Sequence, residues 1–506
     1  MFKFVDNFID KITMYRLVLY YLIAILLVAV ILSFFNLLPY NPIFLAFEPI
    51  YLIGVCWVFN KIFAKIFNAP TNLESLYITA LILSLIITPP SGFTDLVSLF
   101  WVGLLAMASK FIFSIKNKHL FNPVAISVFL TSLVINQSAS WWVGNAYLTA
   151  VVLIGGLLVM RKTRKEDMIF TFIIVVLIVT FGFTVTKNED VVLTLRQLFL
   201  HSSLFFLAFA MLTEPYTLPP TRYLQVIYAS IVGFLFVPDV QFSGYYFTPE
   251  VALLIGNIFA YIVSPKSKFI LYLSQKIKIG SDSLDFVFKL PRKMNFIPGQ
   301  YMEYTLEHNS PDSRGNRRYF TLANSPTEDT MRLGVKFYEN GSTFKKAMLG
   351  MNTKNRIVGD QLSGEFTMPE DINTKLAFLA GGIGVTPFRS MIKYLSDINQ
   401  KRDIVVFFAN KHPEEIIYTD IFNEAYNKFG IKTVYTLTDT NTIPANWNRY
   451  TGRISPEMIQ KECPDYIERV FYISGPHNMV EDSVYTLKQM GVDTKNIKKD
   501  FFPGLV

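Results

Sequence analysis

Ten apolar runs separated by short polar connections fill the first 265 residues, and they constrain the fold more than any other feature. The runs lie near residues 17–38, 42–60, 74–90, 97–115, 121–136, 146–160, 168–186, 197–213, 223–238 and 249–264. Segments of this length and composition are typical of membrane helices, because in lipid each backbone polar group must be satisfied inside its own segment. We therefore expect an α-helical polytopic membrane domain of about ten spans over residues 1–265.

The distribution of basic residues predicts the orientation of this domain. Ten spans place both termini on the same side of the membrane, and alternate connections carry the Lys and Arg residues. These residues are Lys61, Lys65, Lys116, Lys118, Arg161, Lys162, Arg164, Lys165, Arg222, Lys266 and Lys268. The positive-inside rule then predicts a multi-pass protein of the plasma membrane with both termini and the polar C-terminal half in the cytoplasm.

The net charge of +8 favours the lipid bilayer as a partner over nucleic acid, because the basic residues form no arm or repeat. The two cysteines, Cys56 and Cys463, are too few for an iron–sulfur cluster or a zinc site, and no metal site is predicted. Glu48, before Pro49, is the one carboxylate that invites an ion-transport role, and a capped or interfacial acid is the favoured interpretation.

Proline motifs recur at an offset of five spans. "LFNPVAISV" opens the fifth run and "YFTPEVALL" the tenth, while "IITPPSG" follows the third and "LTEPYTLPP" the eighth. Since five is odd, the two halves would be inverted repeats, and broken helices at matching places favour ligand sites. One site is expected on the cytoplasmic side, at Asn122, Pro123, Glu214 and Pro215, and one on the outer side, at residues 89–92 and 247–249. The alternative is that these prolines only begin and end helices.

The first half resembles the flavin-carrying B subunit of sodium-pumping NADH:quinone reductase and the D subunit of the Rnf complex. "HLFNPVA" is similar to their FNPA element and "MLTEPYTLPPT" to their TDP element, with Glu214 in place of Asp. The resemblance extends over about 75–264 and implies a flavin. The loop "NQSASWWVGN" lacks the Thr to which those subunits attach FMN, so a non-covalent flavin (FMN or riboflavin) or a quinone is expected.

The C-terminal half changes pattern. Short alternating runs broken by Pro and Gly predict an antiparallel β-barrel over 266–372, and alternating strands and helices predict a doubly wound α/β domain over 373–506. The strand "RRYFTLANSP" and the following "ENGSTFKKAM" resemble the FAD-binding elements of the ferredoxin:NADP reductase superfamily. The resemblance implies that Arg318 holds the FAD pyrophosphate, Phe320 offers a face to the ring and Thr321 contacts flavin N5. The remaining residues that it assigns to FAD are Tyr319, Gly341, Ser342 and Thr343.

"KLAFLAGGIGVTPFRS" and "VFYISGPHNMV" resemble the NAD(P)-binding elements of the same superfamily, with Ser474 in place of a Cys beside the nicotinamide. The residues that the resemblance assigns to the coenzyme are Gly381, Gly382, Gly384, Thr386, Pro387, Asn410, Ser474, Gly475, Pro476 and Met479. It also implies that Phe501 or Phe502 covers the flavin, and Thr321 and Ser474 are the candidate catalytic residues. Glu414 and Glu415 favour NADH because they would repel a 2'-phosphate, whereas Lys411 leaves NADPH as the alternative.

The acceptor of the electrons is expected in the membrane domain. Only His119 and His201 fall in or beside the runs, on opposite sides of a core about 30 Å thick, which argues against a haem-containing ferric reductase. We expect an NAD(P)H-dependent FAD oxidoreductase that passes electrons to a membrane-bound flavin or quinone, across the bilayer to an outer acceptor and with further electron-transfer subunits as partners. The alternative is a flavin-binding or flavin-transporting membrane module with a tethered reductase.

Overall fold

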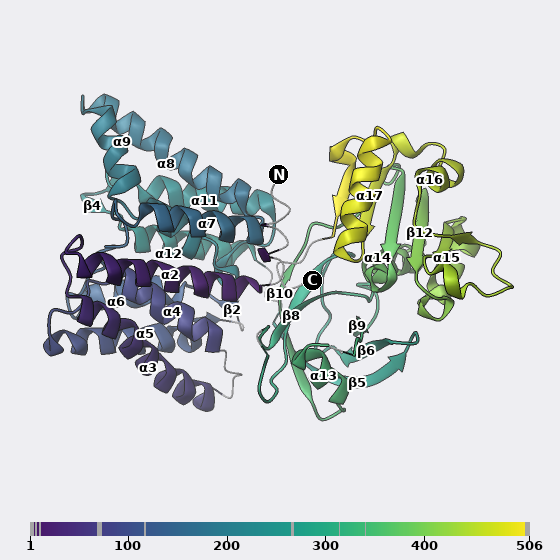
Figure 1. Cartoon of the computed structure of the whole chain (residues 1–506), viewed down its shortest axis with the longest axis horizontal. Coiled ribbons are helices and arrows are strands. Elements are labelled where there is room, and N and C mark those ends of the chain that lie inside the picture. The colour runs from purple at the N-terminus through teal and green to yellow at the C-terminus, as the bar shows by residue number, and fades with distance from the viewer. Residues whose placement is uncertain are drawn as a thin grey trace. The chain divides into compact units, whose positions relative to one another are not determined.

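The structure, a computed structural model, describes Val5, Phe8, Ile9 and residues 12–67, 73–115, 118–264, 268–312, 314–339 and 341–500. The chain forms two compact units that divide between Lys266 and Ser267 (Figure 1). The first unit is built of helices and the second is built around two sheets.

The first unit contains a helix at each of the ten predicted runs. The helices are α2 (Met14–Phe34), α3 (Pro42–Ile66), α4 (Leu73–Ile86), α5 (Leu96–Ile112), α6 (Pro123–Val134), α7 (Thr149–Thr163), α8 (Glu166–Thr186), α9 (Val191–Leu200), α10 (Leu204–Phe206), α11 (Arg222–Phe236) and α12 (Pro249–Val263). Between α10 and Leu212 the chain forms a π-helical segment, η2 (Leu207–Met211). Two short hairpins complete the unit, β1 (Ser114–Ile115) with β2 (Lys118–His119), and β3 (Gln241–Phe242) with β4 (Tyr245–Tyr246).

Several of these helices are long and apolar enough to cross a membrane. Four reach that length, at Met14–Phe34, Pro42–Ile66, Phe93–Ile112 and Glu166–Thr186. The pair Val191–Leu200 and Leu204–Met211, bent by 50°, makes a fifth if it counts as one span. The shorter apolar helices are α4, α6, α11 and α12. The ten-span count and the inside–outside topology therefore stay predictions.

Proline and asparagine fix where two of the helices begin. Pro42 and Pro123 occupy first-turn positions, where a missing amide hydrogen costs nothing, and Asn41 and Asn122 cap the preceding ends. Each Asn side chain accepts hydrogen bonds from two backbone amides of the first turn. The Asn-Pro pairs thus set the position of each helix start.

The first sheet of the second unit is antiparallel and six-stranded, in the order β8-β7-β10-β5-β6-β9. Its strands are β5 (Phe269–Lys278), β6 (Ser283–Lys289), β7 (Tyr301–Thr305), β8 (Arg317–Thr321), β9 (Thr330–Lys336) and β10 (Arg356–Ser363), with helix α13 (Thr343–Gly350) between β9 and β10. Its core includes Leu271, Phe286, Met302, Tyr304 and Phe344. Strands β8 and β9 are the edges, so closure into a barrel stays a prediction.

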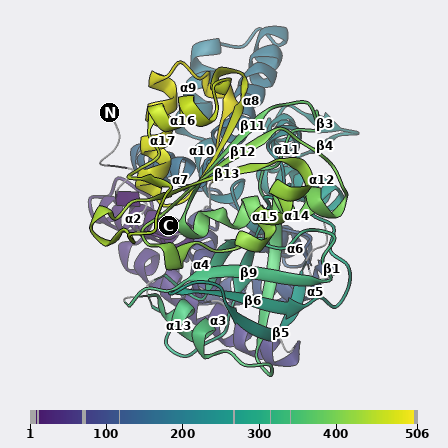
Figure 2. The same ribbon diagram turned by 90° about the vertical axis from the view of Figure 1, so that its right-hand side faces the viewer.

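The second sheet is parallel and six-stranded, in the order β14-β13-β12-β11-β15-β16, and β11, β12 and β13 lie side by side (Figure 2). The strands are β11 (Leu376–Gly381), β12 (Ile404–Asn410), β13 (Lys432–Leu437), β14 (Tyr450–Thr451), β15 (Val470–Ser474) and β16 (Ile497–Lys499). The helices are α14 (Thr386–Asp397), α15 (Thr419–Phe429), α16 (Pro456–Glu462) and α17 (His477–Gln489). The chain runs outward from β11 to β14 and then returns to β15, so the order reverses between β11 and β15. Such a switch point is where doubly wound sheets bind nucleotides.

Candidate functional site

Strand β8 carries Arg318 and Phe320 on one face, toward helix α13. The Arg318 guanidinium carbon lies 5.3 Å from the centre of the Phe344 ring, and the Phe320 ring centre lies 6.1 Å from the same ring. The side chain of Ser342 caps α13 by accepting a hydrogen bond from the Lys345 amide. The structure thus brings the predicted residues Arg318, Phe320 and Ser342 together at the start of this helix.

A carboxylate occupies the N-terminus of α13. Asp312 Oδ2 accepts hydrogen bonds from the Thr343 amide, at 2.9 Å, and from Arg314 Nη2, at 2.8 Å, while Arg318 Nη2 lies 3.7 Å from Asp312 Oδ1. Burial acts to raise the pKa of Asp312, but the hydrogen bonds from Arg314 and the Thr343 amide outweigh it and hold the pKa at about 2. The start of α13 and the two arginines thus hold one carboxylate of the chain itself.

Positive charge is in surplus at this site. Burial, together with the nearby charges of Arg318 and Arg314, lowers the pKa of Lys345 to about 8. The Lys345 ammonium donates to the carbonyl of Lys336, at 2.8 Å. A group with two negative charges, such as the FAD pyrophosphate, fits here because it would relieve the repulsion among the three cations.

Sequence analysis missed Asp312, Arg314 and Lys345. The signal that could have found them is the basic run "RGNRRY" before and within the strand, together with the Lys in the first turn of the next helix. Their meeting depends on how the 306–316 loop folds back onto α13, which residue spacing does not encode.

The other face of β8 carries Arg317 and Tyr319. Tyr319 packs edge-on against Tyr301, with ring centres 5.6 Å apart, and Arg317 Nη1 lies 3.6 Å from Glu303 Oε1. Thr321 ends the strand and is buried. Tyr319 and Phe320 therefore lie on opposite faces, so a flavin ring that packs on one face of the strand contacts only one of them.

The two predicted NAD(P) loops meet at the carboxyl ends of β11 and β15. A Cβ added to Gly384 would lie 2.5 Å from the Ser474 carbonyl oxygen, and one added to Gly381 would lie 2.2 Å from Met479 Sδ. At Gly384 only glycine allows this approach of two backbones, whereas the atom that faces Gly381 is the end of a flexible side chain. The structure thus brings together Gly381, Gly382, Gly384, Ser474, Gly475, Pro476 and Met479 at the switch point of the sheet.

Ser474 has a partner that sequence analysis missed. Its hydroxyl donates a hydrogen bond to Asp500 Oδ2 at 3.0 Å, and the Asp500 amide donates to the carbonyl of Ile473 at 2.9 Å. Phe501 and Phe502, predicted to cover the flavin, lie outside the described residues. The oxygen of Ser474 is thus oriented by the residue just before this pair.

The remaining predicted residues of the NAD(P) site border this loop or the next strand. Thr386 begins α14, followed by Pro387, and its hydroxyl donates to the Ile383 carbonyl. Asn410 ends β12 and is 3% exposed, and neither atom of its side-chain amide has a hydrogen-bond partner within the described part of the chain. Buried amides are nearly always hydrogen-bonded, so Asn410 fits a site whose ligand supplies the missing partner.

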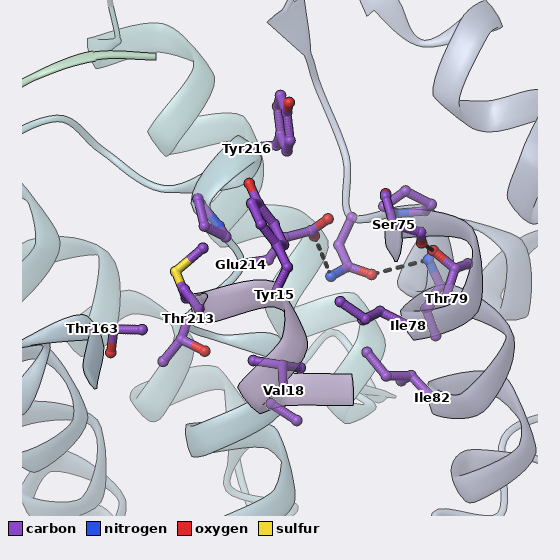
Figure 3. Close-up of a pocket in the computed structure, with 16 residues that line it drawn as sticks. Tyr15, Val18, Ser75, Ile78, Thr79, Ile82, Thr163, Thr213, Glu214 and Tyr216 are labelled. Carbon is purple, nitrogen blue, oxygen red and sulfur yellow. Dashed lines mark hydrogen bonds between the residues drawn. The ribbon is translucent and has the colours of Figure 1, made fainter. Parts of the chain in front are cut away.

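A pocket in the first unit contains the predicted membrane-site residues (Figure 3). Its empty space, the mouth included, is about 610 Å³. It is lined by Met14, Tyr15, Val18, Ser75, Ile78, Thr79, Ile82, Asn122, Pro123, Val124, Thr163, Ala210, Thr213, Glu214, Pro215 and Tyr216. The walls thus come from α2, α4, α6, the end of α7 and the segment from η2 to Tyr216.

Asn122 and Glu214 are directly bonded in this pocket. Asn122 Nδ2 donates to Glu214 Oε2 at 2.6 Å, while Asn122 Oδ1 accepts from the amides of Val124 and Ala125. The Asn122 amide donates to Asn257 Oδ1 of α12, at 2.8 Å. Two proline-broken segments 92 residues apart in sequence therefore form one polar wall.

The predicted outer site is linked through a third segment. Trp141 Nε1 donates to Glu250 Oε2 of α12 at 2.9 Å, and the Trp141 amide donates to the carbonyl of Ile86 at the end of α4. The loop after α6 thus joins the end of α4 to the start of α12. A ligand pocket at residues 89–92 and 247–249 stays a prediction.

Family models match the second unit in two places. The oxidoreductase FAD-binding domain matches residues 271–360 and the oxidoreductase NAD-binding domain matches residues 378–484.

Among curated relatives, the reductase subunit of glycine betaine monooxygenase from Chromohalobacter salexigens is 24% identical over 221 residues, which cover 43% of this chain and 59% of the relative. The F subunit of the Na⁺-translocating NADH-quinone reductase of Neisseria meningitidis is 31% identical over 147 residues, covering 28% of this chain and 36% of the relative. The chain thus spans less than two thirds of these relatives.

Among solved structures, the cytochrome P450 reductase GcoB of Amycolatopsis aligns with a TM-score of 0.42 and 20% identity, over 47% of this chain and 70% of that one. The C-terminal half of the chain thus contains an FAD-binding and an NAD-binding domain of the oxidoreductase type.

Proposed function

We propose that the chain is a plasma-membrane, NADH-dependent FAD oxidoreductase that delivers electrons to a second, non-covalent flavin held at Asn122 and Glu214. The pocket in the helical unit carries this proposal, because its polar wall is built from the two proline-broken segments that sequence analysis pairs.

In the reductase half, the chain's own residues bind and orient the two nucleotides. Arg318, Arg314 and the start of α13 would hold the pyrophosphate of FAD, and the glycine loops of β11 and β15 would admit the coenzyme to the switch point. Ser474, held by Asp500, would lie beside the nicotinamide, and Thr321 would offer its hydroxyl to the flavin. When bound, FAD supplies the conversion of hydride into single electrons.

The chemistry of the membrane pocket favours a flavin over a quinone. Glu214 is an acceptor when ionised, and a flavin ring offers it an N–H donor that a quinone lacks. Val18, Ile78 and Ile82 line the pocket as apolar wall, and Tyr15 and Tyr216 add aromatic faces (Figure 3). The start of α6 at Pro123 would also stabilise a ring that gains negative charge.

The charges near the end of β12 favour NADH. Glu415 pairs with Lys336, with Oε2 and Nζ 3.0 Å apart, so its charge is largely compensated. Glu414 then remains as the acid that would repel a 2'-phosphate, while Lys411 would attract one. The chain is therefore expected to bind NADH more tightly than NADPH. The difference in affinity should be smaller than two uncompensated carboxylates would give.

The test is to analyse bound cofactors in the purified full chain and in Arg318→Ala. Loss of the Arg318 guanidinium should remove FAD, because an unpaired pyrophosphate is costly to hold, and should leave the membrane flavin in place. A variant that retains neither flavin nor quinone, and takes up none when flavins are offered, would refute the membrane site. A membrane flavin that NADH fails to reduce without oxygen would instead favour a flavin-binding or flavin-transporting module.

A further inference from the structure

Helix α3 carries a carboxylate on its buried face. Glu48 is 0% exposed and lies in line with Leu45, Leu52, Cys56 and Asn60, the residues that α3 turns toward its neighbours. The helix is one of those long and apolar enough to span a membrane. Packing of α3 turns this side chain inward, and no described residue caps it, so the interpretation of Glu48 as a capped acid is wrong, while its depth in a membrane stays a prediction.

Among the described residues, no hydrogen-bond donor is in place to stabilise a negative charge on Glu48. Neither Oε1 nor Oε2 meets a hydrogen-bond donor among the residues that the structure describes. An ionised carboxylate in such surroundings is strongly disfavoured, whereas a protonated carboxyl is neutral and needs one acceptor for its hydrogen. The neutral form is thus the stable one.

Pro49 leaves one backbone carbonyl of α3 without its usual hydrogen bond, and this carbonyl is a candidate acceptor for the carboxyl hydrogen of Glu48. Because proline has no amide hydrogen, the carbonyl of Leu45, one turn earlier in α3, does not receive the usual helical hydrogen bond. The Leu45 carbonyl, in the turn before Glu48, is thus an acceptor that the helix itself leaves available.

Three charged groups of the neighbouring helices, Arg16, Glu74 and Lys110, lie at the other end of α3. Asp95 lies at the start of α5, where its carboxylate accepts hydrogen bonds from the amide and the hydroxyl of Ser91. Helix α3 packs against α2, α4 and α5. Arg16 of α2 forms an ion pair with Glu74 of α4, and the Lys110 ammonium of α5 donates a hydrogen bond to the carbonyl of Ser75, the residue after Glu74. The start of α3 instead packs along the start of α5, where the Tyr51 hydroxyl donates to the Leu96 carbonyl. These three charged groups therefore cluster away from Glu48.

Tyr40 is a titratable group in the connection before α3. Burial raises the pKa of the Tyr40 hydroxyl, and the charge that Glu48 carries when ionised raises it further. Tyr40 is half-buried against Trp142, with ring centres 5.4 Å apart. Tyr40 is thus a partly exposed polar group at the same end of α3 as Glu48.

We propose that Glu48 is a proton-binding site inside the membrane half, neutral at rest and exchanging its proton with water at the Tyr40 end of α3. The exchange is a proton equilibrium: the carboxylate takes H⁺ from water to form the carboxylic acid and returns it by the same route. The proposal does not depend on a membrane flavin, since it rests on residues that do not line that pocket.

The test is infrared spectroscopy of the full chain in lipid, wild type against Glu48→Gln, an isosteric change to a neutral amide. The wild type should show at neutral pH a C=O stretch of a protonated carboxyl that the variant lacks, and this band should shift when H₂O is replaced by D₂O. Glu250→Gln serves as the matched control, since Glu250 is equally buried but accepts a hydrogen bond from Trp141.

Absence of a Glu48-dependent band would overturn the proposal, and so would a band insensitive to D₂O, which indicates a carboxyl without exchange. Loss of the band on adding Na⁺, but not choline, would also overturn it by assigning the site to a metal cation. If Glu48→Gln does not fold, an apolar carbodiimide, which modifies protonated carboxyls in lipid, should still label Glu48 in the wild type. A labelled peptide map without Glu48 would then refute the proposal.

Discussion

The FAD affinity of the chain should fall as pH rises above about 8, through Lys345. In the FAD-free protein, burial and the charges of Arg318 and Arg314 hold the pKa of Lys345 at about 8, below its usual 10.5. The pyrophosphate adds negative charge and returns the pKa toward its usual value, so FAD binds the protonated form better. The favourable coupling is therefore complete below about 8 and is lost as pH rises through the interval up to the pKa of the complex.

The structure sets the size of this effect. One pKa unit corresponds to about 1.4 kcal/mol, so a full return from about 8 to 10.5 would strengthen FAD binding by about 3 kcal/mol. Lys345 is partly exposed, and solvent screening lowers the expected gain to about 1–2 kcal/mol. Affinity should then fall by up to about tenfold per pH unit above about 8 and change little below it.

The assay is calorimetric titration of FAD into the FAD-free full chain in two buffers of different ionisation enthalpy. FAD binding should take up a substantial fraction of a proton when the pH is about one unit above the pKa of Lys345. It should take up almost none when the pH is about one unit below that pKa. Lys345→Met should abolish the uptake, whereas Lys346→Met, at the exposed neighbouring position, should retain it. Equal uptake in both variants would refute the assignment to Lys345.

Substitutions at Arg318, Gly384, Asp500 and Glu214 test the other contacts of the two cofactor-binding units. Arg318→Ala should reduce FAD retention by about 10- to 100-fold, since a charge-assisted contact contributes about 1.5–3 kcal/mol, and a flavin assay that shows full FAD content would contradict this. Gly384→Ala should raise the KM for NADH, because its Cβ would collide with the Ser474 carbonyl oxygen, and steady-state kinetics with an unchanged KM would exclude the loop from coenzyme binding. Asp500→Asn should slow hydride transfer with little change in KM, measured by anaerobic stopped flow; no change in rate would show that the bond to Ser474 has no part in the reaction. Glu214→Gln should lower membrane-flavin content while FAD content stays constant, and mass spectrometry that finds both unchanged would remove Glu214 from the site.

Local motifs made most of the reductase half predictable from sequence. Gly381, Gly384 and Gly475 were expected in the coenzyme site because a strand, a glycine turn and a helix follow one another within a few residues. The collision that any Cβ would cause there is a local property of the same turns. Asn122 and Glu214 could be paired as well, since the expected ten-span topology places both of their proline motifs on the cytoplasmic side.

Contacts made by loops and by helix rotation could not be predicted in this way. Asp312 reaches the amide of Thr343 across 31 residues, and its position depends on the fold of the intervening loop. Glu48 stands near the start of an apolar run, and whether it faces lipid or a neighbouring helix depends on the rotation of α3 against α5. The π-helical turn before Glu214 has no marker in its residues Leu207–Met211, because it arises from how the chain fits between its neighbours.

Reductive titration of the full chain with NADH, without oxygen, tests the central claim most directly. If electrons pass from the reductase half into the membrane half, the chain should accept more hydride than its FAD content accounts for. The excess should disappear in the Asn122→Ala, Glu214→Gln double variant, while the FAD content stays the same. Uptake that equals the FAD content in the wild type, with flavin or quinone present in the membrane pocket but never reduced, would contradict transfer between the halves.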